Sequence, residues 1–416
     1  MIGLLDCNNF YASCEQVFNP KLKHKPIIVL SNNDGCVIAR SNEAKELGVK
    51  MGEPLFKIKN LIFTKKITVF STNFILYGDL SKRVMSTLKS EVKNLEIYSI
   101  DEAFLDFSEF INLNRAIRLK RKVKKWTGIP VSIGIGPTKT LAKVANHIAK
   151  KKTVEGVCIL DNQDLIKNIL SVFPVENLWG VGEKFANHLK YANINNALEL
   201  KNANPKWIKK IFGINGIKLQ KELNGEICYK LETAKKRKNQ MCTSRSFDRE
   251  INDFDNLQKA ISNFASNCAF KLRCEKSCCS KLSLFLTTNR FKSNNEQYFP
   301  SITLNFDTPT NDSIEIVNTA TKALKMIYRE NINYKKAGVI VHNITPQENV
   351  QMSLFDNIDR KKRNRLMHSI DKINLIMGRE KVQLASQGTN KKWAFKSNLL
   401  SPCYTTRFSD ILTIKI

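Results

Sequence analysis

Three acidic residues follow short apolar runs in a way that suits metal-dependent chemistry. Asp6 follows residues 2–5, and the pair Asp101 and Glu102 follows residues 97–100. Carboxylates held side by side repel one another unless a dication compensates their charge. Mg²⁺ accepts a few carboxylates together with phosphate oxygens, and two such ions can hold the attacking and departing oxygens of a phosphoryl transfer. The Asp-Glu pair alone is better explained by surface acids at a loop end, so the surrounding elements must decide.

Those elements are predicted to bring the acids to one edge of a sheet. Residues 2–5 are typical of a buried strand, and residues 97–107 read as two strands that meet around the acidic pair. Strands that alternate with helices indicate an open α/β sheet covered by helices. The alternating elements are a helix over 76–92, a basic helix over 115–126, a strand over 131–135 and a second basic helix over 139–150. If the acidic strands are neighbours, the three carboxylates lie close together.

The rest of the chain predicts one small subdomain, one helical subdomain and a second α+β unit. Residues 26–39 read as a hairpin with its turn at 31–34, followed by a short helix over 41–47 that ends at Gly48. Residues 165–231 are helical and punctuated by glycine, and the basic run at 235–238 suits a linker. Beyond it, strands are predicted at 243–251, 281–288, 301–304 and 337–344, and helices at 257–274 and 313–328.

The composition indicates a polyanionic partner. The chain has 416 residues, and Lys and Arg outnumber Asp and Glu by 67 to 38, a formal net charge of +29. Such an excess suits nucleic acid or an anionic membrane surface. The apolar runs are too short to span a bilayer, and the N-terminus lacks a signal-peptide pattern. The 11 scattered cysteines suit a reducing cytosol, and Cys274, Cys278 and Cys279 fit packed thiols better than a metal site.

Five blocks of the sequence resemble Y-family DNA polymerases of the UmuC type, the type that forms the catalytic subunit of bacterial DNA polymerase V. The blocks are residues 5–15 (LDCNNFYASCE), 29–40 (VLSNNDGCVIAR), 98–106 (YSIDEAFLD), 134–143 (GIGPTKTLAK) and 403–410 (CYTTRFSD). The resemblance runs nearly from end to end. It implies an α+β multidomain fold, a right-handed polymerase with a ferredoxin-like palm, small fingers, a helical thumb and an α+β little finger.

The resemblance also implies domain boundaries. The palm would comprise residues 1–10 and 76–165, and the fingers residues 11–75. The thumb, with a helix-hairpin-helix, would comprise residues 166–235, and a basic linker residues 236–242. The little finger would comprise residues 243–345, and a C-terminal regulatory tail with a clamp-binding motif residues 346–416.

The resemblance assigns roles to individual residues of the predicted site. Asp6, Asp101 and Glu102 match the carboxylates that hold two Mg²⁺ ions, and the backbone carbonyl of Cys7 would help to hold one of them. Tyr11 matches the steric gate, a ring beneath the sugar that leaves no room for a ribose 2′-hydroxyl. The alternative interpretation of Tyr11 is an ordinary core aromatic residue.

Further residues match the nucleotide-binding positions of the family. Lys45 and Lys150 match the cations that bind the incoming triphosphate, a task that suits the point charge of lysine. The alternative is a solvated helix face. Asn42 stands where many relatives have Tyr, which leaves its contact with the triphosphate open. Small residues would form the roof over the nascent base pair and constrain it weakly, as expected for low-fidelity copying. The roof would consist of Val37, Ile38 and Ala39.

Two more motifs point to DNA and to a protein partner. Gly180 and Gly182, followed by a basic helix, resemble a helix-hairpin-helix, in which the backbone approaches phosphate without reading sequence. A plain glycine turn is the alternative. The basic run at 360–365 suits either a solvated face or a DNA contact. A segment that resembles the peptide by which bacterial polymerases bind the sliding clamp consists of Gln351, Met352, Ser353, Leu354 and Phe355.

The resemblance implies an error-prone translesion DNA polymerase that adds deoxynucleotides to a primer 3′ end in the SOS response to DNA damage. Its partners would be primer–template DNA, deoxynucleoside triphosphates, a processed UmuD-type dimer, the RecA filament and the sliding clamp, in the cytoplasm at the nucleoid and without a membrane. A palm-fold nucleotide cyclase would share the two-metal chemistry but would need neither the positive charge nor the clamp peptide. A non-catalytic checkpoint or scaffold subunit would not need an intact set of carboxylates and Tyr11.

Overall fold

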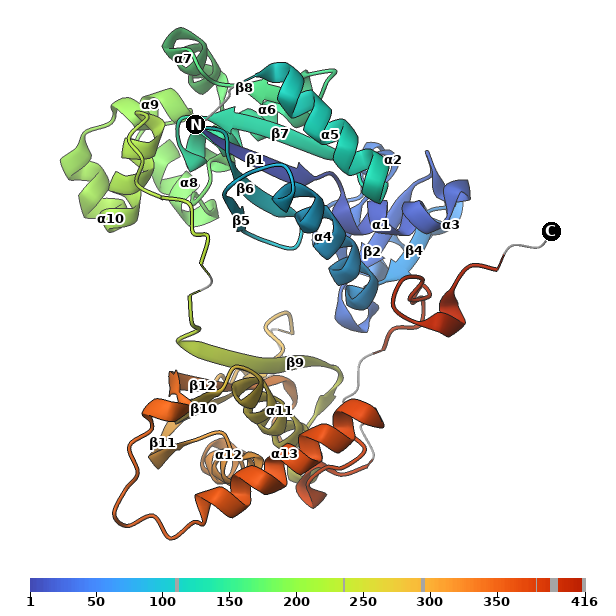
Figure 1. Ribbon diagram of the computed structural model, residues 1–416, viewed down its shortest axis with the longest axis vertical. Coiled ribbons are helices and arrows are strands. Elements are labelled where there is room, and N and C mark those ends of the chain that lie inside the picture. Colours follow the sequence, from blue (N-terminus) through green and yellow to red (C-terminus); the bar gives the residue numbers. More distant parts are fainter. Residues whose placement is uncertain (109–111, 235, 293–295, 379, 390–395, 414–416) are drawn as a thin grey trace. The chain divides into compact units, whose positions relative to one another are not determined.

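The computed structural model describes residues 1–108, 112–234, 236–292, 296–378, 380–389 and 396–413 (Figure 1). The chain divides into two compact units, Met1–Lys235 together with Ser397–Ile416, and Lys236–Lys396. This division places residues 346–396 in the second unit and the last residues in the first, whereas the sequence predicted one C-terminal tail. Lys235, the first residue of the predicted linker run, lies outside the described residues.

A five-stranded sheet with the strand order β5-β6-β1-β7-β8 forms the centre of the first unit. Its strands are β1 (Ile2–Cys7), β5 (Leu95–Ile97), β6 (Glu102–Asp106), β7 (Val131–Gly136) and β8 (Val157–Ile159). β1 runs antiparallel to both β6 and β7, and Asp6 lies directly opposite Glu102. The predicted adjacency of the acidic strand ends is therefore confirmed. Directly opposed residues point to the same side of a sheet, so both carboxylates share one face.

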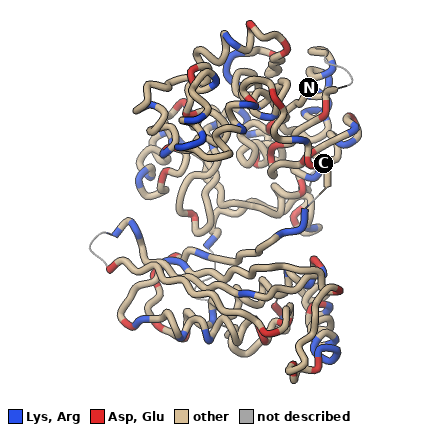
Figure 2. The backbone as a smooth tube through the Cα atoms, turned by 90° about the vertical axis from the view of Figure 1, so that its left-hand side faces the viewer, with Lys and Arg blue, Asp and Glu red and all other residues tan. Residues whose placement is uncertain are grey.

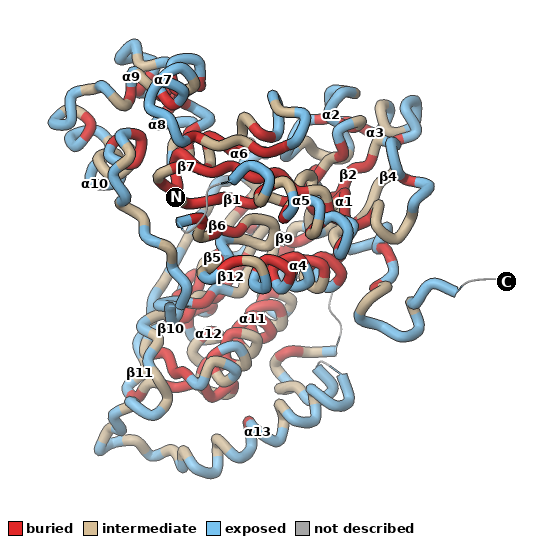
Figure 3. The backbone as a smooth tube through the Cα atoms, turned by 45° about the horizontal axis from the view of Figure 1, so that its top comes forward, coloured by how far each residue is buried: buried red, intermediate tan, exposed pale blue. Residues whose placement is uncertain are grey.

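Helices cover both faces of this sheet. They are α4 (Phe74–Lys89), α5 (Leu113–Thr127) and α6 (Lys139–Lys152). Successive residues of a strand point to opposite faces; Leu5 packs with α4 and α5, whereas Leu4 packs with Ala142 of α6. A Cβ atom at Gly134 would lie 2.0 Å from the backbone nitrogen of Asn146, so only glycine lets α6 approach β7 this closely. The buried path of β1 and β7 is visible in Figure 3.

A small α+β subdomain, residues 10–71, is inserted between β1 and α4. It contains α1 (Phe10–Phe18), β2 (Ile27–Leu30), β3 (Val37–Arg40), α2 (Asn42–Glu46), α3 (Leu55–Thr64) and β4 (Thr68–Ser71). β2 and β3 form the predicted hairpin, and β4 adds a parallel strand to β2. The predicted helix after the hairpin is α2, which Ser41 caps by accepting a hydrogen bond from the Ala44 backbone. α3 and β4 were not predicted from the sequence.

The helical subdomain that the glycine-punctuated segment predicts is also present in the first unit. It consists of α7 (Gln163–Val172), α8 (Glu183–Tyr191), α9 (Ala197–Asn202) and α10 (Pro205–Leu223). Its core includes Leu141 and Val144, so the subdomain packs on the same helix α6 that covers the sheet. α10 is interrupted at Gly213, whose φ of +64° is a conformation that side-chain-bearing residues rarely adopt.

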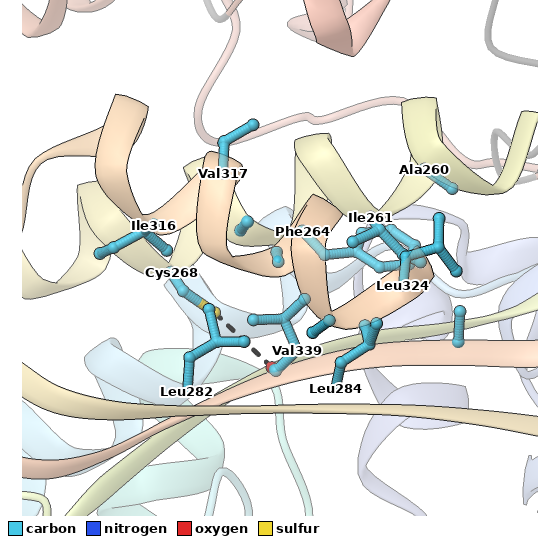
Figure 4. Packing of buried hydrophobic residues seen from close by; sticks show 14 of the residues in the cluster. Ala260, Ile261, Phe264, Cys268, Leu282, Leu284, Ile316, Val317, Leu324 and Val339 are labelled. Carbon is cyan, nitrogen blue, oxygen red and sulfur yellow. Dashed lines mark hydrogen bonds between the residues drawn. The ribbon is translucent and has the colours of Figure 1, made fainter. Parts of the chain in front are cut away.

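The second unit is a four-stranded antiparallel sheet with the strand order β11-β10-β12-β9. Its elements are β9 (Gln240–Ile251), α11 (Phe254–Cys274), β10 (Ser277–Thr288), β11 (Ser301–Thr310), α12 (Ser313–Ile327) and β12 (Tyr334–Pro346). α11 and α12 pack side by side on the sheet, where Phe264 and Leu324 meet Leu284 and Val339 (Figure 4). Two residues of the cysteine cluster, Cys278 and Cys279, are buried in β10, and the third is exposed at the end of α11.

A helix that the sequence analysis did not identify follows this sheet. α13 (Arg360–Ile376) is mostly exposed (Figure 3), but ion pairs hold it to the unit. Arg273 contacts Asp371 at 2.7 Å, and Arg360 contacts Glu315 at 2.5 Å. Arg363 contacts Asp312 at 3.6 Å. The basic run at 360–365 is therefore partly engaged within the unit, because its first arginine holds α13 in place.

Candidate active site

The acidic corner lies where β1 ends and β6 begins. The backbone N–H of Cys7 donates to the carbonyl of Asp101 at 2.8 Å, which ties the end of β1 to the turn before β6. Within that turn, the hydroxyl of Ser99 donates to the Asp101 carboxylate at 2.6 Å and accepts the backbone N–H of Glu102 at 2.9 Å. The structure thus brings Asp6, Asp101 and Glu102 together at one corner.

Two lysines of α6 neutralise this corner. Lys150 Nζ lies 2.6 Å from Asp6 Oδ1, and Lys143 Nζ donates to both carboxylate oxygens of Glu102 at 3.0 and 3.1 Å. Lys143 was not predicted as a site residue. The spacing of seven residues between the two lysines, nearly two helical turns, was the signal that could have identified it.

The raised pKa of Asp6 shows why the carboxylates of this corner require positive charge nearby. Burial raises the pKa of Asp6 to about 7, against the opposing effect of Lys150, and the charge of Glu102 raises it further. Burial also raises the pKa of the Cys7 thiol well above its usual range, so this side chain is a neutral core group. Between the two groups of Cys7, the thiol and the backbone carbonyl, the carbonyl is therefore the one suited to bind a metal ion.

The donor set fits a divalent metal ion of the Mg²⁺ type, which prefers carboxylate oxygens. In this structure the lysine ammonium groups supply the positive charge that the carboxylates need. Across the residues that the structure describes, no three His, Cys, Asp or Glu side chains are gathered as a ready-made metal cluster. A metal ion bound at this corner would compete with the lysines for Asp6 and Glu102.

Tyr11 lies on α1 beside the corner and is supported by other aromatic rings. Its ring stacks on Tyr77 of α4 with the centroids 4.6 Å apart and the planes 16° apart, and it meets Phe74 edge-on at 6.0 Å. Tyr11 remains partly exposed, whereas its neighbour Phe10 is buried. Of the two aromatic residues, Tyr11 is the one that can meet a ligand.

Lys45 lies close to the same corner, at the edge of the small subdomain. Its Nζ donates to the side-chain oxygen of Asn9 at 2.5 Å and contacts that of Asn42 at 3.4 Å. Burial lowers the pKa of Lys45, and the charges of Arg40 and Lys150 lower it further. Lys45, Arg40 and Lys150 therefore form one positively charged region. An anionic ligand bound there would reduce the repulsion among these cations. Lys and Arg also occur along both units (Figure 2).

The three residues predicted for the roof over the base pair differ in exposure, as alternation along β3 requires. Val37 and Ala39 are buried, and Ile38 between them is partly exposed. Of these three side chains, Ile38 is therefore the one best placed to meet a base pair.

The predicted glycine hairpin and clamp peptide are both accessible. Gly180 has φ +88°, Gly182 precedes the first residue of α8, and nothing lies within 4 Å of a Cβ atom built at either glycine. In the second unit, Leu354 and Phe355 are 99% and 89% exposed, a costly arrangement for large apolar side chains unless a partner covers them. Where the structure is described, no helix is both long and apolar enough to span a membrane.

The fold is that of Y-family DNA polymerases. A chimera of the Y-family DNA polymerases Dbh and Dpo4 superposes with a TM-score of 0.67 at 22% identity over 83% of this chain and 99% of the chimera. An insertion ternary complex of Dbh DNA polymerase superposes with a TM-score of 0.55 over the same shares of the two chains. The predicted α+β polymerase fold is confirmed.

The sequence places the chain within this class. The profile of the impB/mucB/samB family matches residues 5–147, and that of the family's C-terminal domain matches residues 238–354. A C-terminal domain of unknown function matches residues 364–414. The protein UmuC of Salmonella typhimurium is 42% identical over 422 residues, covering 100% of both chains. The chain therefore belongs to the impB/mucB/samB family of UmuC-type Y-family polymerases, and it is a translesion DNA polymerase.

Other relatives agree with this assignment. MucB of Escherichia coli is 37% identical over 423 residues, covering 100% of both chains. DNA polymerase IV 1 of Bacillus subtilis is 33% identical over 228 residues, 53% of this chain and 54% of that protein. These similarities support binding of DNA and nucleotide and dependence on a divalent metal ion. They do not favour a nucleotide cyclase or a non-catalytic scaffold.

Proposed function

We propose that the chain elongates a primer by two-metal nucleotidyl transfer at the corner of β1 and β6. Asp6, Asp101, Glu102 and the backbone carbonyl of Cys7 would hold the Mg²⁺ ions. When bound, such ions lower the pKa of the primer 3′-hydroxyl and neutralise the triphosphate. The observation that carries the proposal is that Lys150 and Lys143 already neutralise Asp6 and Glu102 at this corner.

The residues of the chain prepare the site for its ligands. Lys150 and Lys45 approach the corner from α6 and α2, and both can transfer their hydrogen bonds to a triphosphate. Asn42 shares the Lys45 contact through its side-chain oxygen, so it orients the lysine. Lys143 holds Glu102 in place by donating to both of its carboxylate oxygens. These roles explain why lysines from α6 and α2 lie beside three carboxylates.

Tyr11 is proposed to select the sugar. Its ring is held by the stack with Tyr77, so it cannot retreat easily from a ligand that needs more room. A ribose 2′-hydroxyl would require such a retreat, whereas deoxyribose would not. Ile38, a partly exposed apolar residue of β3, contributes a small apolar surface to the nascent base pair. A small surface tolerates distorted pairs, which suits synthesis past damaged bases.

The partners are proposed from exposed features of the chain. Gly180 and Gly182 open the backbone to a DNA phosphate at the start of α8. Leu354 and Phe355 offer two exposed apolar anchors to a sliding clamp. The resemblance to UmuC-type proteins supports a processed UmuD-type dimer and a RecA filament as further partners, in the SOS response.

The test is primer extension with Mg²⁺ on undamaged and abasic templates, with and without the UmuD-type and RecA partners. Asp101→Ala should abolish extension. Asp106→Ala is the matched control, because Asp106 lies at the far end of β6, the strand that follows Asp101. Its carboxylate accepts hydrogen bonds from Asn94 and Ser108. Extension that survives Asp101→Ala, or that is lost equally in both variants, would contradict the metal assignment.

A second test addresses sugar selection. Tyr11→Ala should increase incorporation of ribonucleotides relative to deoxynucleotides, whereas Tyr11→Phe, which keeps the ring, should not. Unchanged sugar discrimination in Tyr11→Ala would place the gate elsewhere.

A further inference from the structure

The C-terminal segment, residues 397–410, binds the first unit where the small subdomain joins the sheet. Two chain segments make that junction, α1 and the turn between β4 and α4. The backbone N–H of Ser71, at the end of β4, donates to the Leu399 carbonyl at 2.9 Å, and the Leu399 N–H donates to the Ser71 hydroxyl at 3.0 Å. In Figure 1 the red C-terminal segment lies beside β4. The segment thus continues the small subdomain with residues from the far end of the chain.

A buried polar group fixes the segment to both halves of the junction. The hydroxyl of Ser401 donates to Glu15 Oε1 of α1 at 2.9 Å. The side-chain amide of Asn73 donates to the Ser401 carbonyl at 2.9 Å, while its oxygen caps α4 by accepting the Leu76 N–H at 3.2 Å. Ser401, Glu15 and Asn73 are all at most 6% exposed. Buried polar groups must satisfy one another, so these contacts specify one docking position.

Two neighbouring contacts extend the docked surface. The ring of Tyr404 stacks on Phe18 at the end of α1, with the centroids 4.7 Å apart and the planes 16° apart. Cys403 is 4% exposed, and its backbone N–H donates to the Asp410 carboxylate at 2.8 Å. The segment is therefore packed and folded, and it covers part of α1.

A continuous series of contacts links this segment to Tyr11. The same Glu15 oxygen that accepts the Ser401 hydroxyl also accepts the hydroxyl of Tyr77 at 2.5 Å. Tyr77 is fully buried, and its ring stacks on Tyr11. Burial raises the pKa of Glu15, so its carboxylate depends on the hydroxyls that donate to it. Loss of the Ser401 hydroxyl would therefore loosen the group that fixes Tyr77 beneath Tyr11.

We propose that Ser401 is a positioning residue of the nucleotide site, which acts through Glu15 and Tyr77 to hold Tyr11 against the sugar. The inference rests on the proposed role of Tyr11 as the sugar gate. It gives a role to the last part of the C-terminal domain of unknown function, which matches residues 364–414. Through this contact, the C-terminal segment would support the selection of the sugar by Tyr11. The two residues in direct contact, Ser401 and Glu15, are 386 positions apart in the sequence.

The experiment compares Ser401→Ala with Thr406→Ala in the full chain. Thr406 is exposed on the same segment, so its variant loses a hydroxyl without touching the buried group. The readout is kcat/KM for a deoxynucleotide divided by that for the matching ribonucleotide. Ser401→Ala should lower this ratio by roughly three- to tenfold, less than the full effect of a hydrogen bond to a charged group, because the loss reaches Tyr11 only through Glu15 and Tyr77. Thr406→Ala should leave it unchanged.

Two further measurements separate positioning from general damage. Tyr77→Phe removes the other donor to Glu15 but keeps the stacked ring; it should lower the ratio to a similar extent. The double variant with Ser401→Ala should lose no more than either single variant, because both act through one carboxylate. Alkylation of Cys403, followed by mass spectrometry, should be faster in Ser401→Ala than in the unaltered chain, and this readout needs no polymerase activity.

The outcomes distinguish this inference from the proposed function. If the unaltered chain never extends a primer, both fail. If it extends primers and discriminates between sugars, but Ser401→Ala and Tyr77→Phe discriminate equally well, this inference alone is refuted. Slow alkylation of Cys403 in Ser401→Ala would likewise refute the docking role of Ser401.

Discussion

Lys150 has two possible roles that predict opposite effects of its removal. In the proposed function, Lys150 would transfer its hydrogen bond from Asp6 to the incoming triphosphate. If Lys150 only pairs with Asp6, it competes with the metal ion, and its removal should help metal binding. Lys150→Gln keeps the length of the side chain but removes the charge, so it separates the two roles.

The structure sets the size of the expected effect. A hydrogen bond to a charged group contributes about 1.5–3 kcal/mol. The side chain of Lys150 is 35% exposed, so screening by solvent favours the lower part of this range. At 1.4 kcal/mol per factor of ten, a loss of about 1.5–2 kcal/mol lowers kcat/KM for the deoxynucleotide by about 10- to 30-fold.

The assay is single-nucleotide primer extension at saturating and at limiting Mg²⁺. Lys151→Gln is the matched control, because it removes the same charge from an exposed neighbour on α6. Lys150→Gln should lose activity at both Mg²⁺ concentrations, and Lys151→Gln should lose little. Equal activity of the two variants, or a gain for Lys150→Gln at limiting Mg²⁺, would refute the triphosphate role.

Three further predictions follow from the structure. Lys139→Met should lower the free energy of unfolding of the first unit by about 3–5 kcal/mol, because it leaves the buried Glu96 carboxylate without the ammonium group 2.5 Å away. Chemical denaturation measures this loss. Glu96→Gln in the same chain should restore part of it. Burial raises the pKa of Glu15, so the folded protein holds this proton more tightly than the unfolded chain does, and stability falls as pH rises through the folded-state pKa. Glu15→Gln should therefore raise the melting temperature at about pH 8 and lose this benefit near pH 4, the usual range of Glu; an equal effect at both pH values would contradict the argument. Replacing Leu354 and Phe355 by Ala should abolish binding to the sliding clamp in a pull-down while leaving the melting temperature unchanged, because both side chains are exposed; retained binding would exclude this peptide as the anchor.

The sequence predicted the elements whose signal is local. The strand before Asp6, the hairpin at 26–39 and the long helices each have a periodicity or a turn residue that identifies them. β4 has only four residues, too few to show an alternation, and it forms because β2 offers an edge for parallel pairing. α13 is polar over most of its length and is held by ion pairs, so it lacks the apolar stripe on which helix prediction depends.

The site was predicted less completely than the fold. The three carboxylates follow apolar strands, but this pattern alone favoured surface acids. Like Lys150, they were predicted as site residues because of the family resemblance. Lys143 was missed because its role depends on how α6 lies across β1, which no local pattern records. The contact between Ser401 and Glu15 joins residues separated by 386 positions, and only the folded chain reveals it.

The docking of residues 397–410 has a consequence for how the two units are connected. Because the chain leaves the first unit at Lys235 and returns to it at Ser397, the second unit is joined to the first at both of its ends. Binding of the returning segment is intramolecular, so its effective concentration is on the order of millimolar and even a weak intrinsic affinity keeps it bound. A molecule that competes for the surface of α1 would have to overcome this local concentration. Its success would leave the second unit on a single tether and release the support of Tyr11 in the same event.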